Sequence, residues 1–413
     1  MEVIVNIFGK KVGTLFELNG NISFEYDSSF IDSGLNLSPL KLPFNTHTYS
    51  NYDDKYFQTL AGVFFDSLPD KFGTKIIQRY YESKSLAAKD LTILQKLVFI
   101  GNKGMGALEY EPRENVLDDI DIYEPLEIRN MYEFSKKVIK GETTQTIRNM
   151  LLFMDSEASA GGARAKAVVG WDRDKDILVS GVSKLKKNYE YWLVKFDTYD
   201  EDNNSLDFTK LEYVYMSMAK KCGIDIPNID LIKDKDLTHF AIKRFDRVDN
   251  KKIHMHSLAS LVHVNFNEPS HFSYDEALRV VRYITKDMQA VEEFYKRAIF
   301  NIVARNQDDH AKNTSFLMDE KGIWTLSPAY DITYANGAGF TKNHQMSFLG
   351  KNCDFTYNDL LKLADSFEIK KADTIIDNII DVVSGFRKEA KVLNIREDLI
   401  NLVENDLRID INR

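Results

Sequence analysis

The chain has 413 residues, enough for two or three domains at about 100–200 residues each. Hydrophobic residues make up 44% of it and aromatic residues 12%, so the composition excludes disorder and supports a sizeable core. The formal net charge of −9 makes the whole chain a poor ligand for the phosphate backbone of DNA or RNA. Contact with nucleic acid would therefore need a local basic patch or a basic partner.

Cysteine content and hydropathy predict a cytoplasmic protein. The two cysteines, Cys222 and Cys353, are too few for a disulfide framework or an all-thiolate metal site, and they fit a reducing compartment. The first residues lack a basic stretch followed by a long apolar one, so we expect no signal peptide. No apolar run approaches the roughly 20 residues that cross a bilayer.

Residues 1–125 are expected to form a first subdomain of strands and helices. Three short strands are expected within residues 1–27, and a helical region runs from about Asp53 to Phe99. A glycine-rich corner, Gly101–Gly106, follows it. The acidic stretch Glu114–Glu127 then indicates a solvated connection to the next part of the chain.

Residues 126–254 are expected to be rich in strands. The clearest alternating pattern is Tyr189–Asp197, and another strand is expected at Phe240–Phe245. Between them the apolar spacing predicts a helix over Leu206–Cys222, closed by Gly223, with Cys222 in the core.

Residues 255–413 read as mainly helical. Helices are expected at Ser273–Ile284, Met288–Ala304 and Lys371–Lys388. One hairpin, Thr314–Leu326 with a turn at Lys321-Gly322, interrupts them. The order predicts an α+β, bilobal, protein-kinase-like fold, with a strand-rich N-terminal lobe and a mainly helical C-terminal lobe.

A polar run follows the helix expected to end near Ala304, and it reads Asn306-Gln307-Asp308-Asp309-His310-Ala311-Lys312-Asn313. Kinase catalytic loops hold a carboxylate that orients the hydroxyl proton and, after four further residues, an amide that binds magnesium. Asp308 and Asn313 have this spacing, and Asp308-x-His310-x-x-Asn313 also resembles the lipid-kinase loop. The alternative is a polar loop that only caps the helix.

A second acid, Asp331, follows the expected hairpin in the run Leu326-Ser327-Pro328-Ala329-Tyr330-Asp331-Ile332. In kinases an acid at this place binds the metal that bridges the phosphates. The usual Asp-Phe-Gly is absent, and a single aspartate after a strand is commonly a turn former. The position of Asp331 behind Asp308 and Asn313 makes the metal-binding interpretation more specific.

Two further features are candidates for nucleotide contact. Lys195 ends an alternating strand, and Glu212 on the next helix is its candidate carboxylate partner, with Glu190 and Glu201 as competitors. The loop Ser159-Ala160-Gly161-Gly162-Ala163-Arg164-Ala165-Lys166 combines small residues with cations, which suits phosphate contact. It is not a Walker A motif. His271 and His344 are isolated in the sequence and are expected at the surface.

In combination these motifs resemble the HipA family of serine/threonine kinases, the toxins of type II toxin–antitoxin systems. The resemblance spans nearly the whole chain, because the first subdomain also carries similar runs at Leu40–Phe44, Phe64–Asp70 and Gly104–Leu108. The matching runs of the second half are Ser159–Lys166, Trp192–Phe196, Lys243–Arg247, Asp308–Asn313 and Ser327–Asp331.

The resemblance implies roles for individual residues. Asp308 would be the catalytic base, Asn313 and Asp331 would bind Mg2+, and Lys195 would contact the ATP phosphates. The loop Ala160, Gly161, Gly162, Ala163 and Lys166 would cover those phosphates, and Ser159 would be an inhibitory autophosphorylation site. Asp309 stands where a small residue is also found in the family, so Asp308 and Asp309 compete for the role of base. His310 is a secondary candidate for the site.

The resemblance also implies partners. These are a small helix-turn-helix antitoxin (HipB-like), operator DNA reached through that antitoxin, and a protein substrate. Aminoacyl-tRNA synthetases are the candidate substrates. An alternative function is a co-repressor with little kinase activity that holds the antitoxin on DNA. A small-molecule kinase, suggested by the spacing around His310, ranks lower because no surface pattern indicates membrane binding.

Overall fold

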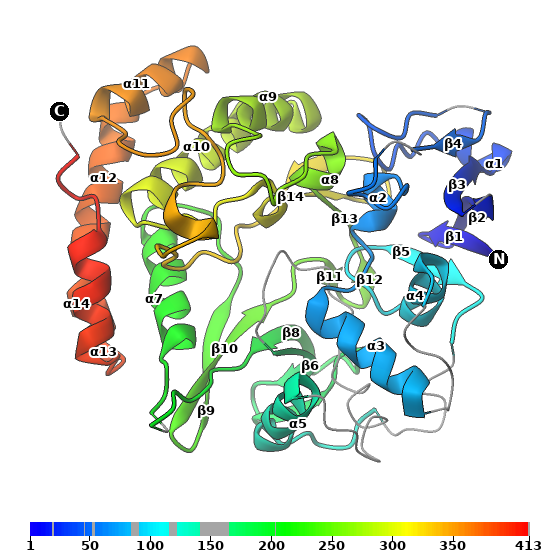
Figure 1. Cartoon of the computed structure of the whole chain (residues 1–413), viewed down its shortest axis with the longest axis horizontal. Coiled ribbons are helices and arrows are strands. Elements are labelled where there is room, and N and C mark those ends of the chain that lie inside the picture. Colours follow the sequence, from blue (N-terminus) through cyan, green and yellow to red (C-terminus); the bar gives the residue numbers. More distant parts are fainter. Residues whose placement is uncertain are drawn as a thin grey trace. The chain divides into compact units, whose positions relative to one another are not determined.

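The computed structural model describes residues 1–18, 20–44, 46–51, 54–83, 91–114, 122–140, 165–202 and 204–411 (Figure 1). The chain divides into two compact units. The first unit comprises Met1–Phe196, Ala241–His263 and Leu317–Ile323. The second comprises Asp197–Phe240, Val264–Phe316 and Trp324–Arg413.

The first unit begins with an antiparallel sheet in the order β4-β3-β2-β1-β5. Its strands are β1 (Glu2–Ile7), β2 (Lys10–Leu18), β3 (Asn21–Tyr26), β4 (Tyr49–Ser50) and β5 (Leu108–Glu111). Alternate residues of β1, Val3, Val5 and Ile7, are fully buried, as expected for a sheet with one covered face. Gly13 in β2 has a steric reason, since a Cβ there would lie 2.1 Å from the Glu25 carbonyl oxygen.

A second sheet of the first unit contains β7 (Ile177–Ser180), β6 (Lys166–Asp172), β8 (Glu190–Lys195) and the last three residues of β10 (Leu237–Lys243), in that order. Every residue of β6 is buried, which explains its continuous apolar run. The antiparallel register places Lys166 opposite Lys195.

Helices and short strands complete the first unit. The helices are α1 (Ser28–Ile31), α2 (Gly62–Phe65), α3 (Lys71–Ser83), α4 (Ile93–Ile100), α5 (Ile128–Lys140) and α8 (Leu258–Val262). The short strands are β11 (Arg247–Val248), β12 (Lys251–Lys252) and β13 (His254–Ser257). A capping box between Thr92 and Gln95 explains where α4 begins.

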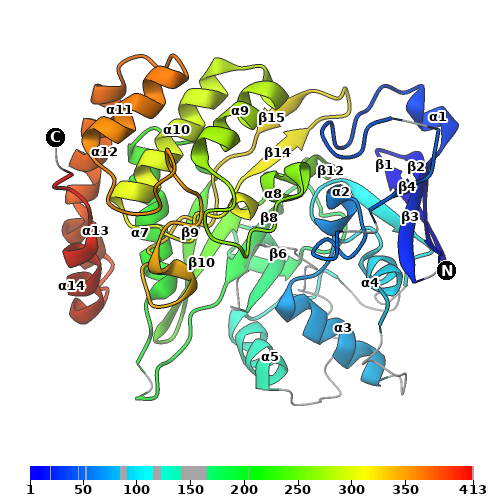
Figure 2. The same ribbon diagram turned by 45° about the horizontal axis from the view of Figure 1, so that its top comes forward.

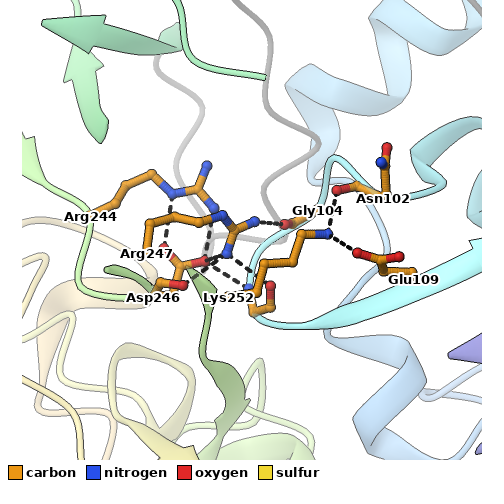
Figure 3. Close-up of polar contacts among 8 residues, drawn as sticks. Asn102, Gly104, Glu109, Arg244, Asp246, Arg247 and Lys252 are labelled. Carbon is orange, nitrogen blue, oxygen red and sulfur yellow. Dashed lines mark hydrogen bonds and ion pairs between the residues drawn. The ribbon is translucent and has the colours of Figure 1, made fainter. Parts of the chain in front are cut away.

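A buried polar network fastens the glycine-rich corner to the segment after β10 (Figure 3). Asp246 is completely buried, and its carboxylate accepts hydrogen bonds from the guanidinium groups of Arg244 and Arg247. It also accepts the backbone N–H of Gly106, while Arg247 donates to the carbonyl oxygens of Gly104 and Gly106. The two arginines hold the pKa of Asp246 well below its ordinary value despite burial.

The second unit is mainly helical. Its helices are α7 (Phe208–Lys221), α9 (Tyr274–Thr285), α10 (Met288–Val303), α11 (Tyr357–Ser366), α12 (Ala372–Ser384), α13 (Phe386–Val392) and α14 (Glu397–Asp406). Two 3₁₀ turns lie at Ala311–Asn313 and Phe340–Lys342. Its strands are β9 (Ile229–Asp234), the first four residues of β10, and β15 (Trp324–Leu326), which pairs with β14 (Ser315–Met318), a strand shared with the first unit.

Helix α10 lies in the core of the second unit and packs against α9 and α12. Helices α12 and α13, drawn in orange and red, lie beside α7 in both views (Figures 1 and 2). The single helix predicted over Lys371–Lys388 is wrong, because the chain breaks at Gly385 into α12 and α13. The predicted core position of Cys222 is confirmed, and burial raises its thiol pKa to about 12.

The predicted α+β fold class is confirmed. The expected strands at the start of the chain and the expected hairpin are present, as are the helices corresponding to α7, α9 and α10. Within the described residues, no helix has the length and apolarity needed to span a membrane.

Candidate active site

A loop at the end of α10 carries the polar run that the sequence marks as a catalytic loop. The helix stops at Val303, and Arg305 turns the chain with a left-handed backbone φ of 59°. Asn306 ties the start of the loop to the helix, since its side-chain N–H donates to Asn301 Oδ1 at 2.9 Å and its backbone N–H donates to the Asn301 carbonyl. The loop therefore leaves the helix in a fixed direction.

Asn313 ends this loop in the first 3₁₀ turn, and its amide has a defined orientation. Its Nδ2 donates to the carbonyl oxygen of Asp308 at 2.9 Å. Its Oδ1 is buried and accepts no hydrogen bond from the described residues. A buried acceptor without a donor is costly, so this oxygen is suited to a ligand that the protein alone does not supply.

Asp331 lines the same pocket as Asn313. Its backbone is left-handed, with φ of 58°, a conformation that aspartate tolerates better than most residues. The preceding Tyr330 is fastened to the loop, because its hydroxyl donates to the Lys312 carbonyl at 2.9 Å and lies 2.6 Å from Ser315 Oγ. Other residues around the pocket include Asp309, His310, Tyr274 and Asn306.

Asp308 differs from its neighbours in being accessible. Its side chain is 39% exposed, and its Oδ1 lies 3.5 Å from Nε2 of the buried His310. The His310 ring packs against Phe266, at 4.8 Å between ring centroids, and burial lowers the imidazole pKa. The imidazole is therefore neutral near pH 7.

Asp309, the second acid of the loop, is completely buried. Its carboxylate accepts the Tyr274 hydroxyl at 2.6 Å, His344 Nδ1 at 2.7 Å and the Gln345 backbone N–H at 2.7 Å. The surface position predicted for His344 is therefore wrong, because the ring is fully buried against this carboxylate. Tyr274, His344 and Gln345 were not identified from the sequence, where no motif relates them to the loop.

The predicted nucleotide contacts lie in both units. Lys195 ends β8 in the first unit, while Glu212 is buried in α7 of the second. Because the two residues belong to different units, the Lys195–Glu212 pair stays a prediction. Lys166 is the first residue of β6 rather than part of a loop, and its Nζ lies 2.9 Å from Asp70 in a buried ion pair. Ser159, Ala160, Gly161, Gly162 and Ala163 lie outside the described residues.

The oxygen atoms that line the pocket bear on whether it can hold magnesium. Among the described residues there is no cluster of three or more His, Cys, Asp or Glu side chains placed to hold a metal ion. Asn313 and Asp331 instead offer one amide oxygen and one carboxylate. Mg2+ is commonly held by one or two such oxygens, with phosphate oxygens and water as its remaining ligands, so this donor set fits a nucleotide-bound magnesium.

The fold and the loop together define a chain of the α+β, kinase-like class. The family models of the HipA N-terminal domain and the HipA-like C-terminal domain match residues 3–111 and 158–386. The chain belongs to the HipA family. A solved structure with a similar fold, the Shewanella oneidensis MR-1 toxin–antitoxin complex of HipA, HipB and operator DNA, has a TM-score of 0.66 and 17% identity. The match covers 98% of this chain and 94% of that one.

Curated relatives are similar over shorter stretches. "Putative kinase Y4dM" of Sinorhizobium fredii is 29% identical over 202 residues, which are 43% of this chain and 46% of the relative. "Serine/threonine-protein kinase toxin HipA" of Shewanella oneidensis is 22% identical over 142 residues, 29% of this chain and 33% of the relative. The matches therefore span less than half the length of either relative.

Proposed function

We propose that this protein is an ATP-dependent serine/threonine protein kinase of the toxin type. One observation carries the proposal. The buried Oδ1 of Asn313, which accepts no hydrogen bond from the described residues, lines the same pocket as Asp331, and the loop that ends at Asn313 exposes Asp308. This is the arrangement of acid, amide and second acid that phosphoryl transfer uses. The names of the relatives support the same activity.

In this proposal each loop residue has a separate task. Asp308 accepts the proton of a substrate hydroxyl while the hydroxyl oxygen attacks the γ-phosphorus of ATP. The bond between the γ-phosphorus and the β–γ bridging oxygen breaks, and ADP leaves. Asn313 and Asp331 hold Mg2+, which when bound neutralises charge on the phosphates. Lys195 contacts the phosphates, and Glu212 is its candidate carboxylate partner. The loop that includes Ala160–Ala163 covers the phosphates.

Lys166 is a weaker candidate for contact with the ATP phosphates. Its ion pair with Asp70 would have to open first, and breaking a buried ion pair is costly.

Phosphotransfer to protein tests the proposal. The protein is incubated with Mg2+ and labelled ATP, after mass spectrometry has established the phosphorylation state of Ser159. Asp308→Ala and Asp331→Ala should each abolish labelling, as each removes a group used in the transition state. Glu320→Ala, an exposed acid in the turn after β14, is the matched control and should label normally. Unphosphorylated wild-type protein that transfers no label would contradict the proposal.

The proposal includes a toxin–antitoxin context. The structure of similar fold is a complex of HipA, HipB and operator DNA. By this similarity we expect a small helix-turn-helix antitoxin as partner, with DNA reached through it, and a cytoplasmic location. Autophosphorylation of Ser159 would add about −1.5 to −2 charges beside the phosphate loop and so oppose ATP binding. An aminoacyl-tRNA synthetase is a candidate substrate, and growth arrest the expected outcome.

The same solved complex motivates a second candidate function, that of a co-repressor with little kinase activity. Operator binding by the antitoxin, measured with and without this protein, separates the two. If the Asp308→Ala variant represses as wild type and wild type shows no phosphotransfer, the co-repressor function is the one to keep.

A further inference from the structure

The carboxylate of Asp309 accepts three hydrogen bonds from outside its own loop. Both oxygens of its carboxylate are used, Oδ2 by Tyr274 and His344 and Oδ1 by the backbone N–H of Gln345. None of its side chain is exposed, so it is not placed to meet a substrate hydroxyl. A glycine or alanine at this position would make none of these contacts.

The three donors come from parts of the second unit that are themselves fastened. Tyr274 is the first residue of α9, and its backbone N–H donates to the Ser347 carbonyl at 2.8 Å. The Gln345 carbonyl accepts the Ser270 backbone N–H at 2.7 Å. Asp309 therefore joins the loop to the start of α9 and to the segment that follows Asp331.

The same network returns to the start of the loop. Asn301 Nδ2 donates to the Tyr274 hydroxyl at 3.0 Å, and Asn301 Oδ1 accepts from Asn306. Burial and the neighbouring Asp309 charge both raise the pKa of Tyr274 well above its ordinary value, so its hydroxyl keeps its proton and remains a donor. The loop is thus held at Asn306 and again at Asp309, on either side of Asp308.

We propose that Asp309 is a positioning residue, which anchors the loop from the interior through Tyr274, His344 and Gln345 and so fixes the directions of Asp308 and Asn313. The proposal rests on the function proposed above and assigns the two adjacent acids different tasks. Asp308 acts on the substrate, and Asp309 acts through the loop. Residues that orient metal ligands or reacting groups typically contribute about 10- to 100-fold to activity or metal affinity.

Variants that alter the carboxylate or remove one of its side-chain donors test the anchor in the full chain. Asp309→Asn, Tyr274→Phe and His344→Gln are compared for kcat, for the KM of ATP and for the Mg2+ concentration that gives half-maximal activity. We expect kcat to fall about 10- to 100-fold in Asp309→Asn, with a higher half-saturating Mg2+ concentration and a smaller change in KM for ATP. The Asp309→Asn/Tyr274→Phe double variant should lose little more than the worse single variant, because both changes break one network.

A matched control separates positioning from general stability. Tyr295 in α10 is equally buried, and its hydroxyl donates to the Leu360 carbonyl at 3.0 Å, away from the loop. Tyr295→Phe removes the same atom as Tyr274→Phe and should lower the melting temperature without changing kcat. Equal losses of kcat in the two variants would overturn the proposal, as would wild-type values in Asp309→Asn.

A measurement that does not depend on catalysis tests this proposal separately from the kinase proposal. Hydrogen exchange of the backbone amides in residues 306–313 should be faster in Asp309→Asn and His344→Gln than in wild type, and unchanged in Tyr295→Phe. If wild type with unphosphorylated Ser159 transfers no phosphate, the kinase proposal fails, and loop exchange still decides whether Asp309 is the anchor. If Asp309→Asn does not fold, the two single-donor variants carry the test, and unchanged exchange in both would overturn it.

Discussion

At the scale of single residues, the two adjacent acids of the candidate site differ in their exposure to solvent. Asp308 is 39% exposed, while the side chain of Asp309 is completely buried. Sequence spacing identified the pair but left open which of the two is the base. The contacts that distinguish them come from His344 and Gln345, about 35 residues later in the chain, and such contacts have no local signal.

Backbone conformation at Asp331 gives a first prediction. Its left-handed φ of 58° costs glycine nothing and is tolerated by aspartate, whereas alanine is strained there. Asp331→Gly and Asp331→Ala both lose the carboxylate, so neither should transfer phosphate. The glycine variant should nevertheless be more stable than the alanine variant by about 1 kcal/mol.

Denaturant unfolding of the two variants checks this difference. The control is Glu320, an exposed residue without a positive φ, where the order should reverse and alanine should be the more stable substitution. The same order at both positions would mean that the backbone of Asp331 is not strained.

At the scale of elements, the Asp246 network predicts which contacts hold the glycine-rich corner in the first unit. Asp246→Asn keeps the shape of the side chain but removes the buried carboxylate charge that both Arg244 and Arg247 contact. Removing one partner of a buried ion pair typically costs 3–5 kcal/mol, so we expect a loss of about that size in the free energy of unfolding.

The partly exposed pair of Glu190 and Lys243 is the control for this experiment. Glu190→Gln makes the same chemical change in the same unit, but a solvated ion pair contributes only about 0–1 kcal/mol. Urea or guanidinium midpoints of the two variants measure the difference. A loss below about 1 kcal/mol in Asp246→Asn would show that the corner is held mainly by packing.

How much the sequence predicts also depends on the element. Local patterns were enough for α7, α9 and α10, and for the β14–β15 hairpin, because apolar spacing and turn residues are local signals. They failed at Lys371–Lys388, where a continuous apolar stripe crosses the break at Gly385. They also placed Lys166 in a loop, because its strand partner Lys195 lies well beyond it in the sequence and the pairing leaves no local signal.

At the scale of the whole molecule, buried histidines predict an acid-sensitive stability. Burial lowers the pKa of His254 to about 3 and that of His263 to about 4, from an ordinary value of 6.5. The folded state therefore binds fewer protons than the unfolded state below pH 6.5, so the free energy of unfolding decreases as the pH falls. The carboxylate of Asp246 does not contribute to the change between pH 7 and pH 5, because its stabilising effect is lost only as the pH falls below its ordinary pKa of 3.8.

Between pH 7 and pH 5 each of these histidines should cost about 2 kcal/mol, since one pKa unit corresponds to about 1.4 kcal/mol. Denaturant midpoints measured across this range test the expectation. In His254→Gln the dependence on pH should be shallower than in wild type, because a titrating group is lost from the unfolded state. His271→Gln is the control, as His271 is 62% exposed, and it should leave the dependence unchanged. If stability depends equally steeply on pH in wild type and His254→Gln, the protonation of His254 does not differ between the folded and unfolded states. Other groups would then produce the acid sensitivity.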